Sequence, residues 1–278
     1  MKQKLLLMAV ALMTAFGLQA QRSYTFKAGA LNVDGLPEKI AGVNVNEGGH
    51  GAEGTTVANN YLANTGWDII GFAEDFNYHE ELTAAPFSDY YNFGAHGGSV
   101  GVSSIFRSDT DGLGIAVAKW LNFPGGDTKG TVYTWTAYNG YTNNGADGLV
   151  TKGFRMYTVT FDTGIAVDVY VLHMDAGSSD GDISMRETQL GELATQVIKN
   201  TKTNKRPVII IGDTNCRYTR ENLKAGFIDV INAEAQLTIK DAWVELIHNG
   251  EYPVYPSESM MTHTYGNQKG EVVDKVFY

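Results

Sequence analysis

The sequence predicts an α/β fold in which strands and helices are mixed along one domain. Short runs of β-branched residues alternate with amphipathic helical segments. The 278 residues are 43% hydrophobic, which is enough apolar material for one large core. The 32 glycines and 15 tyrosines are typical of a β-rich chain with tight loops. From this pattern alone we expect a two-layered α/β sandwich.

The first twenty residues are expected to lie outside that fold. Lys2 and Lys4 precede an apolar run from Leu5 to Leu18, and Ala20 supplies a small residue at a cleavage position. This is the layout of a secretory signal peptide, and the run is too short for a comfortable membrane span, although an N-terminal anchor is the alternative. We therefore expect a signal peptide over 1–20 and a domain over 21–278, secreted or periplasmic, with no transmembrane segment.

The net charge bears on which molecules the protein can bind, and the cysteine content bears on whether it can form a disulfide. The formal net charge is −10 and becomes more negative without Lys2 and Lys4, which disfavours binding of nucleic acid through phosphate neutralisation. A bound divalent cation would reverse the local charge, so DNA is not excluded. Cys216 is the only cysteine, so no internal disulfide can form, and we expect it to fill the core. We expect a monomer.

The first half of the chain reads as strands separated by loops and one short helix. A strand is predicted over 23–37, where apolar residues alternate until Gly35 and Pro37 end it. Residues 41–54 are a loop by composition. Val57, Tyr61 and Leu62 indicate a short helix over 55–66. Buried or alternating strands are then predicted over 67–75 and 112–120.

The second half contains the clearest helix. Strands are predicted over 154–161, 165–174 and 206–215, and the last of these opens with four consecutive β-branched residues. A polar loop is predicted over 175–185 and a helix over 183–200, with Asp182 as its cap. One apolar stripe supports this helix, formed by Met185, Leu190, Leu193, Val197 and Ile198. The segment 241–246 and a last strand over 271–278 complete the order.

Polar side chains follow the buried strands at the points where the strands end. They are Asn32, Asp34, Glu74, Asp75, His173, Asp175, Asp213 and Asn215, with Asp274 inside the last strand. Residues at strand ends can converge on one edge of a sheet. Carboxylate and amide oxygens suit Mg²⁺ or Mn²⁺, and a histidine can move protons near neutral pH. Each residue alone is equally typical of a turn, a cap or a core histidine; together they predict metal-assisted hydrolysis of a phosphate ester.

Six short segments carry a resemblance to a known family. They are "LNVDGLP", "DIIGFAED", "VLHMDAG", "RETQL", "IIIGDTN" and "VVDKVFY", in this order over nearly the whole chain after residue 20. The sequence resembles the endonuclease/exonuclease/phosphatase superfamily, which has the deoxyribonuclease-I-like fold. The resemblance implies an α/β (α+β) class and a four-layered α/β sandwich, with two packed mixed β-sheets flanked by helices.

The resemblance also implies roles for the polar residues. Glu74 matches the metal-binding glutamate, with Asn32 and Asp34 at the same Mg²⁺ (or Mn²⁺) site, while Ala73 stands where the family has glutamine. His173, Asp213 and Asn215 match catalytic positions, and His173 and Asn215 would contact the substrate phosphate. Asp274 matches the aspartate that orients the family's final histidine, so we also count it as catalytic.

That final histidine is missing from this sequence. The family ends with Ser-Asp-His on one further strand, whereas no such motif follows Asp274, and His263 precedes it. Either the chain is truncated at its C-terminus, which we expect, or it has lost catalysis. In both cases we expect the activity of this chain to be impaired, because members of a catalytic set act together.

Two segments suggest a branch within the superfamily. "SDTDGLGIAV" and "DGLVTKGFRMYTVTF" are similar to the sphingomyelinase-type phosphodiesterases. This resemblance implies a secreted, Mg²⁺-dependent phosphoesterase that hydrolyses phosphodiesters. A secreted nuclease of the same fold and a non-catalytic binding protein on this scaffold are the alternatives, so the partner is a lipid or nucleotide phosphate ester.

Overall fold

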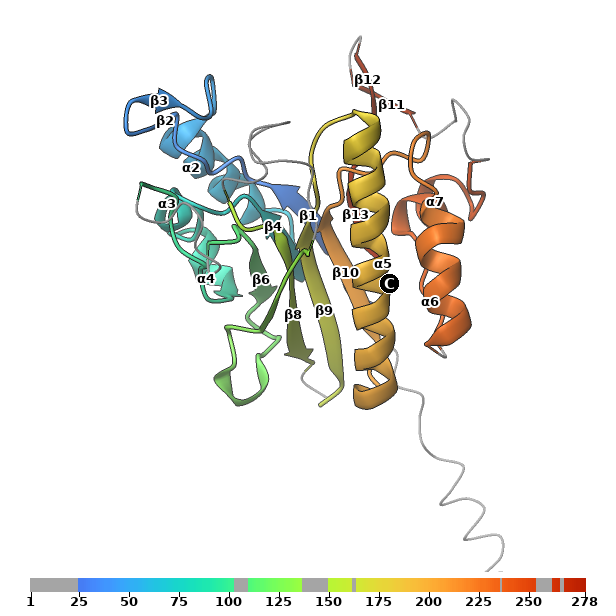
Figure 1. Ribbon diagram of the computed structural model, residues 1–278. Helices are drawn as coiled ribbons and strands as arrows, with labels where there is room; N and C mark the ends of the chain where they lie inside the picture. The colour runs from blue at the N-terminus through green and yellow to red at the C-terminus, as the bar shows by residue number, and fades with distance from the viewer. Residues whose placement is uncertain are drawn as a thin grey trace, which may run out of the picture.

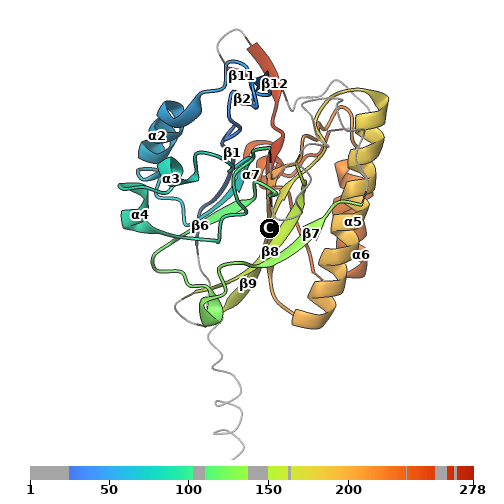
Figure 2. The ribbon, with the colours of Figure 1, turned by 60° about the vertical axis from the view of Figure 1, so that its left-hand side comes forward.

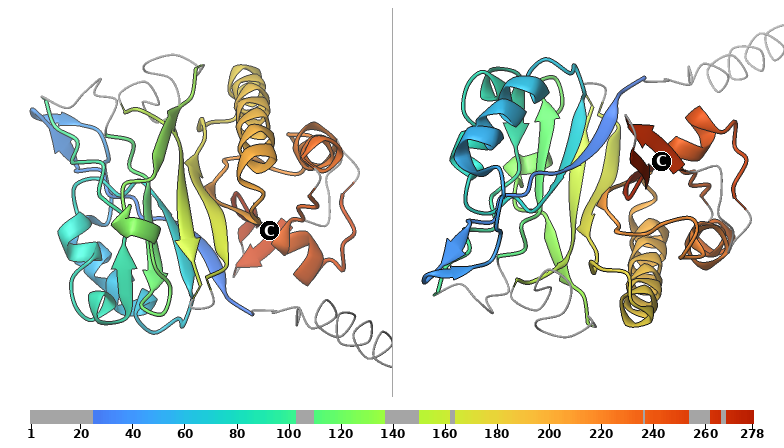
Figure 3. Two further views of the ribbon diagram at one scale, coloured as in Figure 1. Left: turned by 90° about the horizontal axis from the view of Figure 1, so that it is seen from below. Right: turned by 90° about the horizontal axis from the view of Figure 1, so that it is seen from above.

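The computed structural model describes residues 25–102, 110–136, 150–161, 164–235, 237–253, 262–265 and 268–278. The expected signal peptide over 1–20 lies outside these residues. Within them, two β-sheets pack face to face, and each is covered on its outer face by helices (Figures 1 and 3). The predicted four-layered sandwich is therefore confirmed, and the two-layered reading of the pattern alone was wrong.

The first sheet has the strand order β1-β4-β6-β5. Its strands are β1 (Ala28–Asn32), β4 (Ile69–Ala73), β6 (Gly114–Ala118) and β5 (Tyr91–Phe93). The second sheet has the order β13-β10-β9-β8-β7. Its strands are β13 (Asp274–Phe277), β10 (Val208–Asp213), β9 (Ala166–His173), β8 (Gly153–Thr160) and β7 (Thr131–Thr134). The β1–β4 and β9–β10 pairs are parallel and the others antiparallel.

The helices form the two outer layers. The first sheet is covered by α2 (Gly51–Leu62), α3 (His79–Leu82) and α4 (Phe87–Tyr90). The second is covered by α5 (Asp180–Asn204), a π-helical segment (Lys224–Ile228), α6 (Asp229–Glu234) and α7 (Ala242–Ile247). Figure 2 shows α2, α3 and α4 on one side of the sheets and α5 and α6 on the other. The remaining elements are short: β2 (Lys39–Ile40), β3 (Val43–Asn44), β11 (Thr262–Tyr265), β12 (Gln268–Glu271) and a 3₁₀ turn, Pro124–Gly126.

Strand β10 is apolar on both faces because both faces are buried. Val208 and Ile210 belong to the core beneath α5, while Ile209 and Ile211 belong to the core between the sheets. A continuous β-branched run is typical of such a doubly covered strand. The sheets meet closely at Gly71 of β4, where an added Cβ would lie 2.7 Å from Ile211 Cγ1. Tight sheet packing therefore joins the strands whose ends carry Glu74 and Asp213.

Two helix boundaries differ from the sequence predictions. Helix α2 begins at Gly51, inside the predicted loop, and strand β3 of the β2–β3 hairpin also lies in that loop. The side chain of Asn59 fixes this helix by donating to the carbonyls of Leu82 and Ala84, at 2.8 Å each. Val57 and Tyr61, predicted as its apolar face, are 69% and 67% exposed. Tertiary contacts therefore stabilise this helix even though Gly51 and Gly54 have low helix propensity and the apolar pattern is weak.

Helix α5 also begins earlier than predicted, because its cap is Ser179. The Ser179 hydroxyl accepts the backbone N–H of Asp182, and the Asp182 carboxylate accepts the backbone N–H of Ser179 at 2.8 Å. This reciprocal pair is a capping box. Asp182 is therefore the third helical residue rather than the cap, and the polar loop ends at Ser179.

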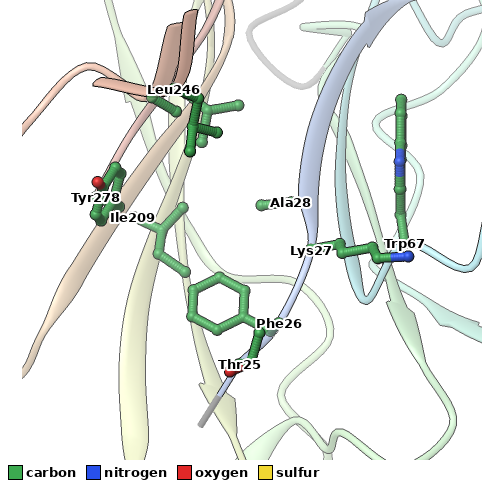
Figure 4. Close-up of a pocket in the computed structure, with 10 residues that line it drawn as sticks. Thr25, Phe26, Lys27, Ala28, Trp67, Ile209, Leu246 and Tyr278 are labelled. Atoms are coloured by element: carbon green, nitrogen blue, oxygen red, sulfur yellow. The ribbon is translucent and has the colours of Figure 1, made fainter. Parts of the chain in front are cut away.

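An apolar groove of about 530 Å³ lies between the start of β1 and the second sheet (Figure 4). Phe26 and Ala28 line one side, and Ile209, Leu246 and Tyr278 line the other. It sits at the opposite end of β1 from Asn32, so it is separate from the polar strand ends. Among the residues described, no helix is both long and apolar enough to cross a membrane.

Candidate functional site

Four of the predicted residues meet where the ends of the two sheets lie together. Asn32 ends β1, Glu74 follows β4, and His173 and Asp213 end β9 and β10 opposite each other. Because β1 packs against β10, the four side chains face one another across the two sheets. We call Asn32, Glu74, His173 and Asp213 the strand-end site.

The amide of Asn32 joins the two carboxylates of this site. Its Nδ2 donates to Glu74 Oε1 at 2.8 Å and to Asp213 Oδ2 at 3.1 Å. Its Oδ1 accepts the backbone N–H of Asp34 at 3.0 Å. Asn32 therefore presents donors to the carboxylates here, and it would have to turn its amide over to offer an oxygen to a cation.

Three residues at or beside the site adopt left-handed backbone conformations. The φ angles of Asp34, Glu74 and Asn215 are 46°, 59° and 49°. Such angles are uncommon for residues other than glycine and concentrate where function fixes the backbone. The backbone N–H of Asn215 donates to Asp213 Oδ1 at 2.8 Å, so the turn holds the carboxylate in place. Asn215 Nδ2 donates to the carbonyl of Met174 at 3.2 Å.

His173 is buried between the carboxylates and a lysine. Its Nε2 lies 3.7 Å from Glu74 Oε1 and 3.9 Å from Asp213 Oδ2. Burial, reinforced by the charge of Lys152, lowers the pKa of His173 to about 3, against a smaller opposing effect of Asp213. The imidazole is therefore neutral at physiological pH and suits a hydrogen-bonding role better than that of a cationic acid.

The sequence reasoning missed Lys152. Its Nζ lies 3.2 Å from His173 Nε2 and donates to the carbonyl of Met174, also at 3.2 Å. Its side chain is buried, which is rare for lysine outside a charged site. Lys152 lies just before β8 in a "TKG" segment, which gives no periodic signal. Only the tertiary fold shows that this cation faces the strand-end site.

Asp274 lies beside the site on the neighbouring strand. It pairs with Asp213 in the β10–β13 register. Burial, followed by the charges of Asp213 and Glu74, raises the pKa of Asp274 to about 7. Its Oδ1 is buried without a hydrogen-bond partner among the described residues. The carboxyl therefore sits in a region with excess negative charge.

Asp34 lies at the rim rather than at the centre of the site. Its Oδ1 accepts from Asn46 Nδ2 at 2.7 Å, and its Oδ2 lies 3.8 Å from His50 Nδ1. No hydrogen bond joins it to Glu74 or Asp213 among the described residues. The structure thus brings Glu74, Asp213, His173 and Asn32 together, places Asn215 and Asp274 directly beside them, and leaves Asp34 further out.

The donor set fits a hard divalent cation. Glu74 and Asp213 offer carboxylate oxygens close to one another, and burial raises the pKa of Glu74 above its ordinary value. The unpartnered Oδ1 of Asp274 adds a further buried oxygen. Clustered carboxylate oxygens are the ligands that Mg²⁺ or Mn²⁺ prefers.

Comparisons with known proteins support the fold. No protein-family description and no curated protein matches the sequence. Among solved structures, beta toxin from Staphylococcus aureus, in a variant with bound magnesium ions, is 17% identical over 91% of this chain and 83% of its own, with a TM-score of 0.57. Truncated TDP2 of Caenorhabditis elegans is 14% identical over 91% and 83%, with a TM-score of 0.53.

A third solved structure, SmcL, gives the same result. It is 16% identical over 91% of this chain and 82% of its own, with a TM-score of 0.53. Each of the three likenesses covers 91% of this chain. At these identities the likenesses show the fold alone, and that fold is the predicted α/β sandwich.

Proposed function

We propose that this protein is a metal-dependent phosphoric ester hydrolase that acts on phosphodiesters with Mg²⁺ or Mn²⁺. One observation carries the proposal: the Glu74 and Asp213 carboxylates, bridged by the Asn32 amide, lie within 4 Å of a buried neutral histidine. The bound magnesium in the beta toxin structure supports a divalent cation in this fold. The proposal thereby explains why polar residues lie together at the ends of four strands.

Each residue has a distinct task in this proposal. Glu74, with Asn32 or Asp34, would hold the cation, which supplies charge stabilisation at the phosphoryl group when bound. Asp213, fixed by Asn215 and Asn32, accepts a proton from the attacking water.

The groups around the phosphate complete the set. Asn215 and the ammonium of Lys152 donate to phosphoryl oxygens, where negative charge develops in the transition state. His173 hydrogen-bonds a phosphoryl oxygen or the leaving group. Asp274 would have the task that the resemblance implies, which is to orient the family's final histidine beside Asp213.

A second groove next to the site favours a lipid phosphodiester as the substrate. This groove of about 510 Å³ is lined by Asn32 and His50 at one end and by apolar side chains that include Val57 and Tyr61. Both of these side chains are mostly exposed. Exposed apolar residues around a cleft mark a surface for apolar partners, whereas the net charge of −10 disfavours a polyanion. We accordingly propose a sphingomyelinase-like activity.

We also propose that residues 1–20 are a signal peptide, that the protein is secreted, and that it is a monomer.

The experiment compares three substrates with the chain as it stands. Bis(p-nitrophenyl) phosphate should be hydrolysed with Mg²⁺ or Mn²⁺ and not after treatment with EDTA. Choline phospholipid in vesicles should be hydrolysed faster than plasmid DNA at matched phosphate concentration. Faster cleavage of plasmid would support the nuclease alternative instead. No metal-dependent turnover of any of the three would contradict the proposed hydrolase and favour a non-catalytic phosphate-binding protein.

A further inference from the structure

A second group of metal-ligating side chains lies directly after Glu74 and is not used by the proposed hydrolysis. It consists of Asp75, which follows β4, His79 at the start of α3, and His96 in the loop after β5. One ligand atom from each residue lies within 4.8 Å of the other two. We call these three residues the Asp–His–His cluster.

The contacts within the cluster are specific. The Nδ1 of His79 lies 2.8 Å from Asp75 Oδ2, and Nε2 of His96 lies 3.0 Å from the Asp75 carbonyl oxygen. The two imidazole rings stack with their centroids 4.1 Å apart and their planes 5° from parallel. Two histidines from distant segments are thus held face to face over one buried carboxylate.

The histidine chemistry leaves ligand lone pairs available. A carbonyl only accepts hydrogen bonds, so Nε2 of His96 carries a proton and Nδ1 of the neutral ring keeps a lone pair. Burial lowers the pKa of His96, which favours this neutral form. The side chain of His79 is 23% exposed and has room to turn, whereas Asp75 is 3% exposed and fixed. The cluster is therefore open on one side and anchored on the other.

We propose that the Asp–His–His cluster is a second metal site that binds a transition cation of the Zn²⁺ class. Two imidazoles and one carboxylate are typical ligands of zinc, and a water completes four-coordination. Hard cations such as Mg²⁺ prefer an all-oxygen set, so the two sites differ in metal preference. Tetrahedral zinc places its ligand atoms about 3.3 Å apart, so the two imidazole rings have to turn out of their parallel stack and the cluster has to contract around the ion.

The bound ion would connect three segments of the first helical layer. Asp75 follows Glu74, whose left-handed backbone sits at the strand-end site, and its own backbone N–H donates to the Gly112 carbonyl at 2.9 Å. An ion held by Asp75, His79 and His96 ties the end of β4 to α3 and to the loop after β5. The proposal requires no hydrolytic activity and stands independently of the proposed function.

The test is zinc binding to the untagged full chain after chelator treatment. Zn²⁺ is titrated in competition with a chromogenic chelator, in a large excess of Mg²⁺ that occupies any oxygen site. One Zn²⁺ should bind per chain, and His79→Gln and His96→Gln should each weaken it at least about tenfold. His248→Gln, a matched change outside the cluster, and Glu74→Gln should leave the affinity unchanged.

A visible absorption spectrum of the unmodified chain with Co²⁺ tests the site without any variant, so the test does not depend on whether the variants fold. Co²⁺ in place of Zn²⁺ should give the intense visible absorption of a four-coordinate site with nitrogen ligands. Absence of stoichiometric Zn²⁺ binding, or binding that Glu74→Gln abolishes and His79→Gln with His96→Gln leave intact, would overturn the proposal. A weak octahedral Co²⁺ spectrum would overturn it as well.

Discussion

Replacing Asp213 with asparagine should lower the turnover number for a phosphodiester by about a thousandfold, with little change in KM. The carboxylate is the proposed proton acceptor for the attacking water, and an amide cannot take that proton at neutral pH. Its two oxygens are already held by the Asn215 backbone N–H and the Asn32 amide, so the geometry for this role is preset. Steady-state kinetics with bis(p-nitrophenyl) phosphate and saturating Mg²⁺ measures the effect.

The same substitution at the other end of the first sheet provides the control. Asp68 precedes β4, where its carboxylate accepts from the backbone N–H of Lys27 and the indole of Trp120. Asp68→Asn should leave turnover within about twofold, because surface polar contacts away from a site have small effects. An Asp213→Asn variant that is folded and retains more than a tenth of the wild-type turnover would exclude Asp213 as the base.

Replacing Arg186 with methionine should lower the free energy of unfolding by about 3–5 kcal/mol. Arg186 and Glu221 are both fully buried, and Nη2 of the arginine lies 2.6 Å from Glu221 Oε1. Loss of the arginine leaves a buried carboxylate whose remaining cation, Arg220, has its Nε 3.9 Å from Glu221 Oε2. Its Nη1 also donates to the carbonyls of Asp175 and Gly177 at 3.0 Å each, which fixes the loop after His173. Urea unfolding followed by circular dichroism measures the change.

Two further variants separate this buried pair from ordinary surface charge. Lys202→Met removes a cation from the same helix, but Lys202 and Glu234 are 53% and 64% exposed, so the cost should stay below about 1 kcal/mol. Arg186→Met combined with Glu221→Leu should recover much of the loss, because both charges leave the core together. An Arg186→Met variant as stable as Lys202→Met would show that the pair contributes nothing to stability.

The parts of the fold that the sequence predicts are those with strong local signals. Strand β10 has four β-branched residues, and α5 has a long apolar stripe, so both are evident from pattern. Strands β5 and β7 have three and four residues and no clear alternation, and they exist because neighbouring strands supply their hydrogen bonds. Helix α2 depends on the contacts of Asn59 with the C-terminal end of α3, which no local pattern shows.

The candidate site likewise contains residues that the sequence predicts and residues that it does not. Asn32, Glu74, His173 and Asp213 each lie at or just after the end of a strand, so position along the chain was enough to predict that they converge. Lys152 lies next to a strand start and becomes a site residue only through burial against His173. The Asp–His–His cluster was likewise hidden, since Asp75 was seen only as one more acid at a strand end and its histidines belong to other segments.

Binding of Mn²⁺ tests the central claim, that Glu74 holds a divalent cation where the two sheets meet. The measurement is electron paramagnetic resonance of free Mn²⁺ during titration of the full chain. The His79→Gln/His96→Gln background removes the Asp–His–His cluster, so among the residues the structure describes the strand-end site is the candidate metal site that remains. Glu80→Gln, an exposed neighbour on α3, is the matched control.

In that background one Mn²⁺ should bind per chain, and Glu74→Gln should weaken it at least about tenfold while Glu80→Gln has no effect. Equal Mn²⁺ affinity with glutamate or glutamine at position 74 would contradict the account, because the carboxylate that follows β4 would then take no part in holding the cation.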